Sequence, residues 1–469
     1  MNSEDTLSLD RRGAQSRPLA APQFFVLLQC ANPLAVPSRH GLADIDELVI
    51  GRGTRAVRRE QDGAVRRLVI HVPDQRMSGV HARIRRSGDG FVLEDAGSKN
   101  GTLVNGHACG RLALADGDFL QLGCSFFSFR FTGTDRGDFT PDLGPNTSPG
   151  TWTMLPDLAE SFARLEQLAR ATVPILILGE SGTGKELVAR AVHQISRRSG
   201  PLVAVNCGAL PSTLVEAELF GYRKGAFSGA IEDRAGLVRV SDHGTLLLDE
   251  VGDLPPSAQP ALLRVLQERE VMSVGATRAT PVDLRVVSAT HRDLEALEES
   301  GCFRADLRAR LAGYTMRLPP LRERREDVGL LIGVLLRRLA GDRAANYTLT
   351  PAIGHSLLTH SWPLNVRELE QCLMAALAMG GSEITSCDLR MARARTPVTP
   401  KAGGTRSPRS LSAPEQAQRD ELAELLRVHA GNISAVARTL GKERIQIRRW
   451  LKRFGLEASP QPKATLSRE

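Results

Sequence analysis

The sequence predicts a multidomain protein: an all-β sandwich, an α/β unit followed by a helical segment, and a small all-α helix–turn–helix. The chain of 469 residues is long enough for about three domains of roughly 100–200 residues each. Short β-type runs separated by glycine turns fill residues 22–133, which is the spacing typical of a sandwich. Strands then alternate with helical segments over residues 151–320, which indicates a mostly parallel sheet.

The composition of the chain excludes several classes of protein. Hydrophobic residues make up 42% and charged residues 24%, unlike collagen, coiled coils or wholly disordered chains. No apolar run approaches the roughly 18 residues that cross a bilayer, and acidic residues stand where a signal peptide is basic. The seven cysteines are never spaced C-x-x-C, which favours reduced thiols over a disulfide framework or a zinc site. We therefore expect a cytoplasmic protein with no membrane partner.

The first 150 residues divide into three segments. Residues 1–21 are polar and lack apolar periodicity, so we interpret them as a disordered arm. Residues 22–133 contain apolar runs such as Phe24–Leu28 and Phe126–Phe131, broken by glycine turns. Residues 134–150 are rich in Gly, Pro, Asp and Thr, which predicts a linker.

Three short motifs follow one another in the predicted sandwich: Ile50-Gly51-Arg52, Ser78-Gly79-Val80-His81 and Ser98-Lys99-Asn100-Gly101-Thr102. In this order they resemble the forkhead-associated (FHA) domain, a β-sandwich that binds phosphothreonine peptides. The resemblance implies that Arg52 pairs with the phosphate and that Ser78 donates its hydroxyl to it. It also implies that Asn100 holds the peptide backbone, with Lys99 as a further cation and His81 supporting the loops. A docking sandwich without a phosphopeptide ligand is the alternative, because Gly79 stands where the family often has Arg or Asn.

A glycine-rich loop runs Gly179-Glu180-Ser181-Gly182-Thr183-Gly184-Lys185. It follows the apolar strand Ile175–Leu178 and precedes a helix that opens with Glu186. Glycines let backbone amides turn toward phosphate oxygens, and the helix N-terminus adds partial positive charge. We expect Lys185 to reach the β- and γ-phosphates of a nucleotide.

A second half of the nucleotide site lies at the end of another apolar strand, Thr245–Asp249. Carboxylates at the C-terminal edge of a strand lie where ligands bind in open α/β sheets. We expect Asp249 to hold Mg²⁺ and Glu250 to polarise the attacking water. ATP and Mg²⁺ are therefore the expected cofactors, and the chain is expected to be an ATPase.

The segment Gly225-Ala226-Phe227-Ser228-Gly229-Ala230 places one aromatic residue among small residues. Together with the phosphate loop, Glu186 included, it resembles the AAA+ domain of bacterial sigma-54-dependent transcription activators, also called enhancer-binding proteins. The resemblance covers residues 151–391, with an α/β core over 151–320 and a helical lid over 321–391. It implies that the 225–230 loop contacts the sigma factor through an exposed Phe227, although a buried turn is the alternative.

The same resemblance implies roles for five further residues. Asn206 fits the switch residue that hydrogen-bonds the catalytic glutamate, and Thr290 fits the first sensor. Arg304 and Arg310 fit the arginines offered to the nucleotide of a neighbouring subunit, which makes catalysis depend on assembly. A structural ion pair is the alternative for each of these two arginines. Arg367 fits the second sensor, carried by the lid.

The C-terminal end carries the whole basic excess of a chain with net charge +8. Residues 392–469 hold 16 Lys/Arg and 7 Asp/Glu, whereas the rest holds 45 and 46. We expect a basic Pro/Ser linker over 392–415, a helical segment broken at Gly441 over 416–456, and a disordered tail over 457–469. The helical segment resembles the Fis-type helix–turn–helix, whose second helix binds double-stranded DNA. Its expected DNA contacts are Arg444, Gln446, Arg448, Arg449, Lys452 and Arg453.

These expectations combine into an ATP-driven activator of sigma-54 RNA polymerase with a phosphothreonine-responsive input. It is expected to bind DNA upstream of promoters as a dimer, to form a hexameric ring, and to remodel the closed promoter complex. A Ser/Thr kinase or its phosphothreonine product is the implied input partner. One alternative is a DNA-binding AAA+ regulator independent of sigma-54, because Ser228, His291 and Leu364 depart from the family pattern. The other is a scaffold whose ATP hydrolysis is vestigial.

Overall fold

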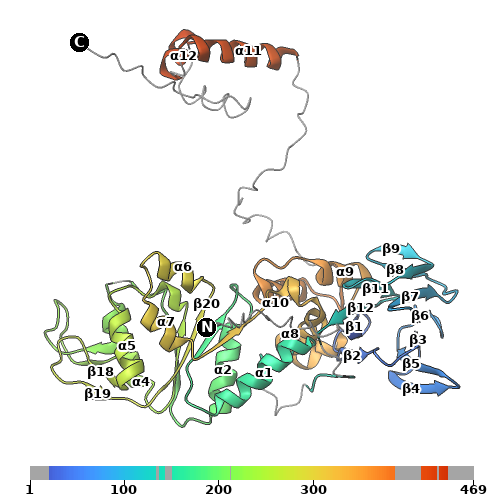
Figure 1. Ribbon diagram of the computed structural model, residues 1–469, viewed down its shortest axis with the longest axis horizontal. Coiled ribbons are helices and arrows are strands. Elements are labelled where there is room, and N and C mark those ends of the chain that lie inside the picture. Colours follow the sequence, from blue (N-terminus) through green and yellow to red (C-terminus); the bar gives the residue numbers. More distant parts are fainter. Residues whose placement is uncertain are drawn as a thin grey trace, which may run out of the picture. The chain divides into compact units, whose positions relative to one another are not determined.

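The computed structural model describes residues 21–133, 137–142, 150–211, 213–385, 413–429 and 433–441. The chain divides into two compact units, one of residues 1–396 and one of residues 397–469 (Figure 1). The larger unit contains the predicted sandwich, the α/β unit and the lid. The smaller unit contains the helices α11 and α12.

The N-terminal part is a sandwich of two six-stranded sheets, as the apolar runs predicted. It begins at Ala21, so the first strand takes in the last residue of the predicted arm. One sheet has the order β2 (Ser38–Gly41), β1 (Ala21–Gln29), β12 (Ser125–Thr132), β11 (Asp118–Leu122), β8 (Thr102–Val104), β9 (His107–Cys109). The other has the order β10 (Arg111–Ala113), β7 (Gly90–Asp95), β6 (Ala82–Ser87), β3 (Glu47–Arg52), β5 (Val65–Val72), β4 (Ala56–Asp62).

The sandwich core lies between these two sheets. Successive side chains of a strand point to opposite faces, so Phe24 and Val26 of β1 enter this core together with Phe127 and Phe129 of β12. The rings of Phe24 and Phe127 are stacked, with centroids 5.6 Å apart. Alternate residues of the apolar run Phe24–Leu28 thus form the inner face of β1.

Part of the predicted linker 134–150 is attached to the sandwich. Phe139 forms an antiparallel bridge with Arg39. Asp138 forms an ion pair with Arg59 at 2.7 Å. Within the predicted linker, paired backbone groups and a charge contact therefore hold residues 138 and 139 against the sandwich.

The α/β unit contains a five-stranded sheet in the order β14 (Leu202–Asn206), β17 (Thr245–Asp249), β20 (Arg285–Thr290), β13 (Ile175–Leu178), β21 (Tyr314–Arg317). All of its strand pairs are parallel, as predicted. Helices α1 (Pro156–Ala169) and α2 (Lys185–Ser196) cover one face. The other face packs against α3 (Val215–Phe220), α4 (Leu237–Val240), α5 (Gln259–Glu268), α6 (Leu294–Glu299) and α7 (Ala305–Leu311).

A buried arginine joins this sheet to α1. The guanidinium of Arg285 donates to the carbonyl oxygens of Leu168, Ala169, Ala171 and Val173. The last carbonyls of a helix have no partner within the helix, so Arg285 satisfies them from inside the protein. Burial lowers the pKa of Arg285 to about 10, which leaves the side chain charged at neutral pH.

The lid is mostly helical. Its elements are η2 (Leu321–Glu323), η3 (Arg325–Asp327), α8 (Val328–Ala340), η4 (Gly341–Asn346), α9 (Pro351–Thr359) and α10 (Asn365–Ala378). It also contains the short parallel pair β22 (Thr348–Leu349) and β23 (Glu383–Ile384). The expectation of a wholly helical segment is wrong at this pair, which closes the connections around α9 and α10.

The smaller unit is helical in its described part. α11 (Ala413–Val428) is followed by α12 (Ile433–Thr439), and Leu422, Leu426 and Val436 are buried. α11 begins within the predicted linker 392–415. The second helix of the expected helix–turn–helix, with its six expected DNA contacts, lies outside the described residues. No described helix of either unit has the length and apolar character needed to cross a bilayer.

Candidate nucleotide site and ligand loops

The phosphate loop connects β13 to α2. Gly182 and Gly184 have φ angles of 77° and 105°, a region that favours glycine. A Cβ on Gly182 would also lie 2.2 Å from the carbonyl oxygen of Leu364. Lys185 is buried, and its Nζ donates to the carbonyl oxygens of Gly179 at 2.9 Å and Glu180 at 3.3 Å. The loop therefore holds a buried cation at the N-terminus of a helix.

Two carboxylates stand at the end of β17, next to this lysine. The Oε1 atom of Glu250 lies 3.5 Å from Lys185 Nζ. Burial and the charge of Glu250 raise the pKa of Asp249. Burial by itself would raise the pKa of Glu250, but the hydrogen bond from His291 and the charge of Lys185 together lower it. Glu250 is thus held as a carboxylate beside a buried ammonium group.

Glu250 takes its hydrogen bonds from the strand on one side of β17. The ring Nδ1 of His291 lies 2.7 Å from Glu250 Oε2, and the His291 backbone N–H donates to the same oxygen. Thr290 Oγ1 lies 3.5 Å from it. Asn206 is the last residue of β14 on the other side of β17, but its Oδ1 accepts from the backbone N–H groups of Gly208 and Ala209. In this structure His291 thus makes the contact expected of Asn206, because Asn206 closes its own turn.

The lid reaches the phosphate loop through several side chains. Arg367 Nη1 donates to Ser181 Oγ at 3.0 Å, where a second sensor was expected. Arg322 binds both carboxylate oxygens of Glu180, at 2.9 and 2.7 Å. Arg324 is buried and donates to the carbonyl oxygen of Thr183 at 2.7 Å. Neither Arg322 nor Arg324 was assigned a role from the sequence. The available signal was the run of charged residues at 322–327, which follows two prolines and a leucine.

A cavity of about 250 Å³ collects the expected nucleotide contacts. Lys185, Asp249, Glu250 and Arg367 all line it. Further lining residues come from the phosphate loop and the lid: Ser181, Gly182, Gly184, Glu186, Leu187, Arg338, Val366 and Glu370. Of the predicted catalytic and cofactor-binding residues, the structure therefore brings Lys185, Asp249, Glu250 and Arg367 around one cavity.

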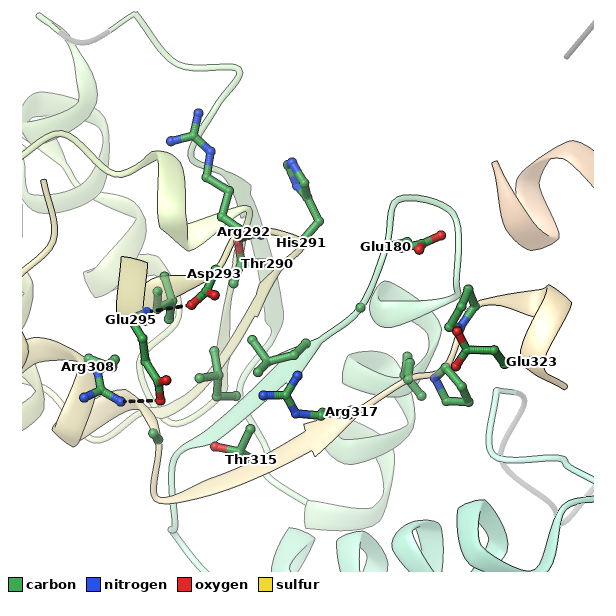
Figure 2. Close-up of a pocket in the computed structure, with 18 residues that line it drawn as sticks. Glu180, Thr290, His291, Arg292, Asp293, Glu295, Arg308, Thr315, Arg317 and Glu323 are labelled. Atoms are coloured by element: carbon green, nitrogen blue, oxygen red, sulfur yellow. Dashed lines mark hydrogen bonds and ion pairs between the residues drawn. The ribbon is translucent and has the colours of Figure 1, made fainter. Parts of the chain in front are cut away.

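A larger cavity of about 550 Å³ lies beside the stem of the same loop, at the ends of β13, β20 and β21 (Figure 2). Glu180, Thr290 and His291 form its border with the phosphate loop. Arg308 lines it and is paired with Glu295 at 3.3 Å (Figure 2). Lys185 and Glu250 do not line this cavity, so the smaller cavity is the one with the chemistry of phosphate binding.

The two arginines expected to act between subunits lie at the two ends of α7. Arg304 is exposed and binds both oxygens of Asp306, at 3.0 and 2.7 Å. Arg310 is also exposed, and its side chain forms no hydrogen bond or ion pair with any described residue. The ion-pair alternative is thus realised for Arg304, whereas Arg310 has no such partner among the described residues.

The expected sigma-contact loop is a short closed turn. Gly225 donates to the carbonyl oxygen of Ala230 at 2.8 Å, and Ala230 donates to that of Phe227 at 3.0 Å. Phe227 is 40% exposed, and its ring lies edge-on to Tyr222 with centroids 5.0 Å apart. The aromatic side chain therefore lies on the surface, as expected, rather than in a buried turn.

Three loops of the sandwich meet where the phosphopeptide contacts were expected. Arg52 donates its backbone N–H to the Ser78 carbonyl oxygen at 2.8 Å, and Lys99 donates its own to Ser78 Oγ at 3.2 Å. His81 accepts from the Ser78 backbone N–H, which supports the loops as predicted. The side chains of Arg52 and Lys99 are exposed. Asn100 Nδ2 donates to the Arg76 carbonyl oxygen. The Asn100 side chain therefore holds the loop that contains Arg76 in this structure.

A single glycine explains how closely these loops approach. A Cβ on Gly51 would lie 1.8 Å from the carbonyl oxygen of Gly79, far below contact distance. Gly51 is therefore required where β3 passes under the 77–81 loop. Gly51 thus allows the loops to pack closely, whereas Arg52 itself faces solvent.

Comparison with known protein families finds matches for the sandwich, the α/β unit and the lid. Residues 153–317 match the sigma-54 interaction domain, residues 48–123 the FHA domain, and residues 322–402 the AAA+ ATPase lid domain. The chain therefore contains an FHA domain and an AAA+ ATPase-type domain. The helix–turn–helix expected at the C-terminal end has no counterpart among these three matches.

Similar proteins include bacterial transcriptional regulators. The hydrogenase transcriptional regulatory protein HoxA of Cupriavidus necator is 42% identical over 301 residues, which cover 62% of this chain and 62% of HoxA. The transcriptional regulatory protein GlrR of Escherichia coli is 40% identical over 311 residues, covering 66% of this chain and 68% of GlrR. A crystal structure of NtrX from Brucella abortus with ATP is 31% identical, covers 67% and 71% of the two chains, and has a TM-score of 0.46. By its sigma-54 interaction domain and its likeness to GlrR, the chain belongs to the family of transcriptional regulators with a sigma-54 interaction domain.

Proposed function

We propose that this protein hydrolyses ATP to activate transcription by sigma-54 RNA polymerase. The observation that carries the proposal is the cavity that brings Lys185, Asp249, Glu250 and Arg367 together in the same domain as an exposed Phe227. A phosphate-binding loop, two carboxylates and a lid cation are the parts that phosphoryl transfer requires. The loop of residues 225–230, with its exposed Phe227, supplies a surface that can contact a protein partner.

The donor set fits a nucleotide with its metal ion. Glycine-rich backbone and Lys185 present positive groups at the start of α2, which suits phosphate oxygens. Asp249 offers carboxylate oxygens, the ligands that Mg²⁺ prefers. When bound, Mg²⁺ neutralises charge on the phosphates. Glu250 then orients and deprotonates the water, while Arg367 reaches the phosphates from the lid.

Assembly and DNA binding complete the proposal. Arg310, and with it Arg304, act on the nucleotide of a neighbouring subunit in a ring, a hexamer by analogy with the family. The residues Arg444, Gln446, Arg448, Arg449, Lys452 and Arg453 hold DNA upstream of the promoter. Their support is the basic excess of residues 392–469 and the α11–α12 helix pair. Cytoplasmic location follows from this role in transcription.

The expected test of sigma-54 contact is a native gel of the purified protein with sigma-54 in the presence of ADP and aluminium fluoride. The wild-type chain is expected to form a complex that depends on the nucleotide analogue. Phe227→Ala should lose it, because the exposed ring is the largest apolar group on the loop. Val240→Ala, which trims an exposed apolar side chain on α4, is the matched control and should keep the complex.

The same gel, read together with an ATP hydrolysis assay of the same protein, separates the alternatives. No complex with the wild-type chain, together with normal ATP hydrolysis, would favour a regulator that acts without sigma-54. No hydrolysis at all would favour a scaffold. Loss of the complex in Val240→Ala as well as in Phe227→Ala would show that the loop has no special part in it.

The FHA domain is proposed to bind a phosphothreonine peptide, supplied by a Ser/Thr kinase, through Arg52 and Ser78. Arg52→Ala is expected to weaken binding about tenfold or more, because hydrogen bonds to charged groups contribute roughly 1.5–3 kcal/mol. Fluorescence titration with a phosphothreonine peptide library, against its unphosphorylated counterpart, measures this. Arg58→Ala changes an exposed arginine on β4 and serves as control. Equal titration curves for the two variants would contradict the assignment.

A further inference from the structure

The first strand of the sandwich is buried on both faces. Phe24 and Val26 enter the sandwich core, whereas Phe25, Leu27 and Leu28 belong to the core of the lid. Antiparallel sheets commonly face water on one side, so an outer face this apolar indicates a permanent cover. Figure 1 shows β1 and β12 against α8 and α9 of the lid, and these elements are in contact.

The lid is shaped for this contact. A Cβ on Gly329 of α8 would lie 1.9 Å from the Leu27 carbonyl oxygen, and one on Gly354 of α9 would lie 2.5 Å from Cys30 Sγ. Glycine inside a helix costs about 1 kcal/mol relative to alanine. One glycine against backbone and one against side chains therefore indicate close packing between the sandwich and the lid.

Backbone groups also join the two parts. Leu349 of β22 donates its N–H to the Cys30 carbonyl oxygen at 2.8 Å. Arg337 of α8 donates to the Leu34 carbonyl oxygen at 2.8 Å. Apolar packing and hydrogen bonds together make the sandwich part of the same body as the lid.

One ion pair of this interface lies two residues from a contact with the phosphate loop. Arg130 of β12 binds Glu326 of η3 at 2.7 Å, and Glu326 is buried. Arg324 donates to the carbonyl oxygen of Thr183 in the phosphate loop. Asp327 accepts from the backbone N–H of Met154, at the entrance to the α/β unit. Residues 324–327 therefore connect the sandwich, the phosphate loop and the entrance segment.

We propose that Arg130 is a positioning residue for the nucleotide site: the FHA sandwich, through Arg130 and Glu326, holds residues 324–327 in the arrangement that shapes the phosphate loop. Loss of the pair leaves Glu326 buried without its cation, which favours displacement of the segment that carries Arg324. Strain or ligand binding in the sandwich then changes nucleotide affinity. This inference rests on the proposed ATPase function and adds the route by which the input domain reaches it.

The test compares nucleotide affinity across mild variants of the full chain. Arg130→Gln and Glu326→Gln are each expected to weaken binding of a fluorescent ADP analogue about 5- to 150-fold, the usual range of coupling between sites. kcat at saturating ATP should stay within about threefold, since neither residue touches the cavity. Arg130→Lys, which keeps the cation, should restore most of the affinity. Arg111→Ala, which removes an exposed arginine paired with Glu94 on the sandwich, is the control.

A second readout distinguishes positioning from general loss of stability. Hydrogen exchange is expected to rise in the peptide that contains residues 324–328 and in the phosphate loop, but not in β4 and β5. The double variant should weaken affinity no more than either single one, since both remove the same pair. Affinity in Arg130→Gln and Glu326→Gln equal to that in Arg111→Ala would overturn the inference. Failure of the wild-type chain to bind the analogue would instead overturn the proposed function.

Discussion

Glu250→Gln is expected to bind ATP as tightly as the wild-type chain and to hydrolyse it at least about a hundredfold more slowly, in line with the loss of a general base. The amide keeps the size of the side chain beside Lys185 and His291, so the phosphate loop should stay in place. It has no negative charge with which to take a proton from water. Phosphate release measures turnover, and titration with a fluorescent ATP analogue measures binding.

Glu166→Gln provides the control for this experiment, because Glu166 is exposed on α1, away from the cavity. It should hydrolyse ATP at the wild-type rate. Undiminished turnover in Glu250→Gln would refute the role of this carboxylate. Loss of binding together with turnover would show that Glu250 serves the shape of the loop rather than the reaction.

Arg310→Ala is expected to lower ATP turnover about 10³-fold without changing nucleotide affinity, the size of effect reported for an arginine supplied across an interface. Its guanidinium has no partner among the described residues and is therefore available to a second chain. Arg304→Ala should cost less, because that side chain must first leave Asp306. Steady-state ATP hydrolysis by the assembled protein measures both effects.

Mixing two inactive variants tests whether Arg310 acts between subunits. Lys185→Ala lacks a working nucleotide site but still offers Arg310, whereas Arg310→Ala has the site and no arginine. A mixture should regain activity at interfaces that combine the two intact halves. No recovery on mixing would show that Arg310 acts within its own chain. Arg343→Ala, an exposed lid arginine, should be active by itself.

Local sequence patterns predicted much of the fold. The apolar runs and glycine turns predicted the sandwich because both are properties of neighbouring residues. The loop from Gly179 to Lys185 predicted one half of the nucleotide site, and the two acids at the end of β17 predicted the other half. The parallel sheet brings the two halves together. The family pattern could not show that Asn206 closes its own turn while His291 holds Glu250. That choice depends on how two side chains pack at neighbouring strand ends.

The sequence by itself predicted which residues carry the chemistry: the glycines and lysine of the phosphate loop, the paired acids, the aromatic loop and the motif around Arg52. Each is a short stretch whose conformation and charge depend on residues close in the chain. Only the tertiary structure decided what lies against them. Arg324 reaches Thr183, and Arg130 reaches Glu326 across 196 positions. Such contacts arise when whole sheets and helices pack, so the run Phe24–Leu28 predicted a strand but could not show that the lid covers its outer face.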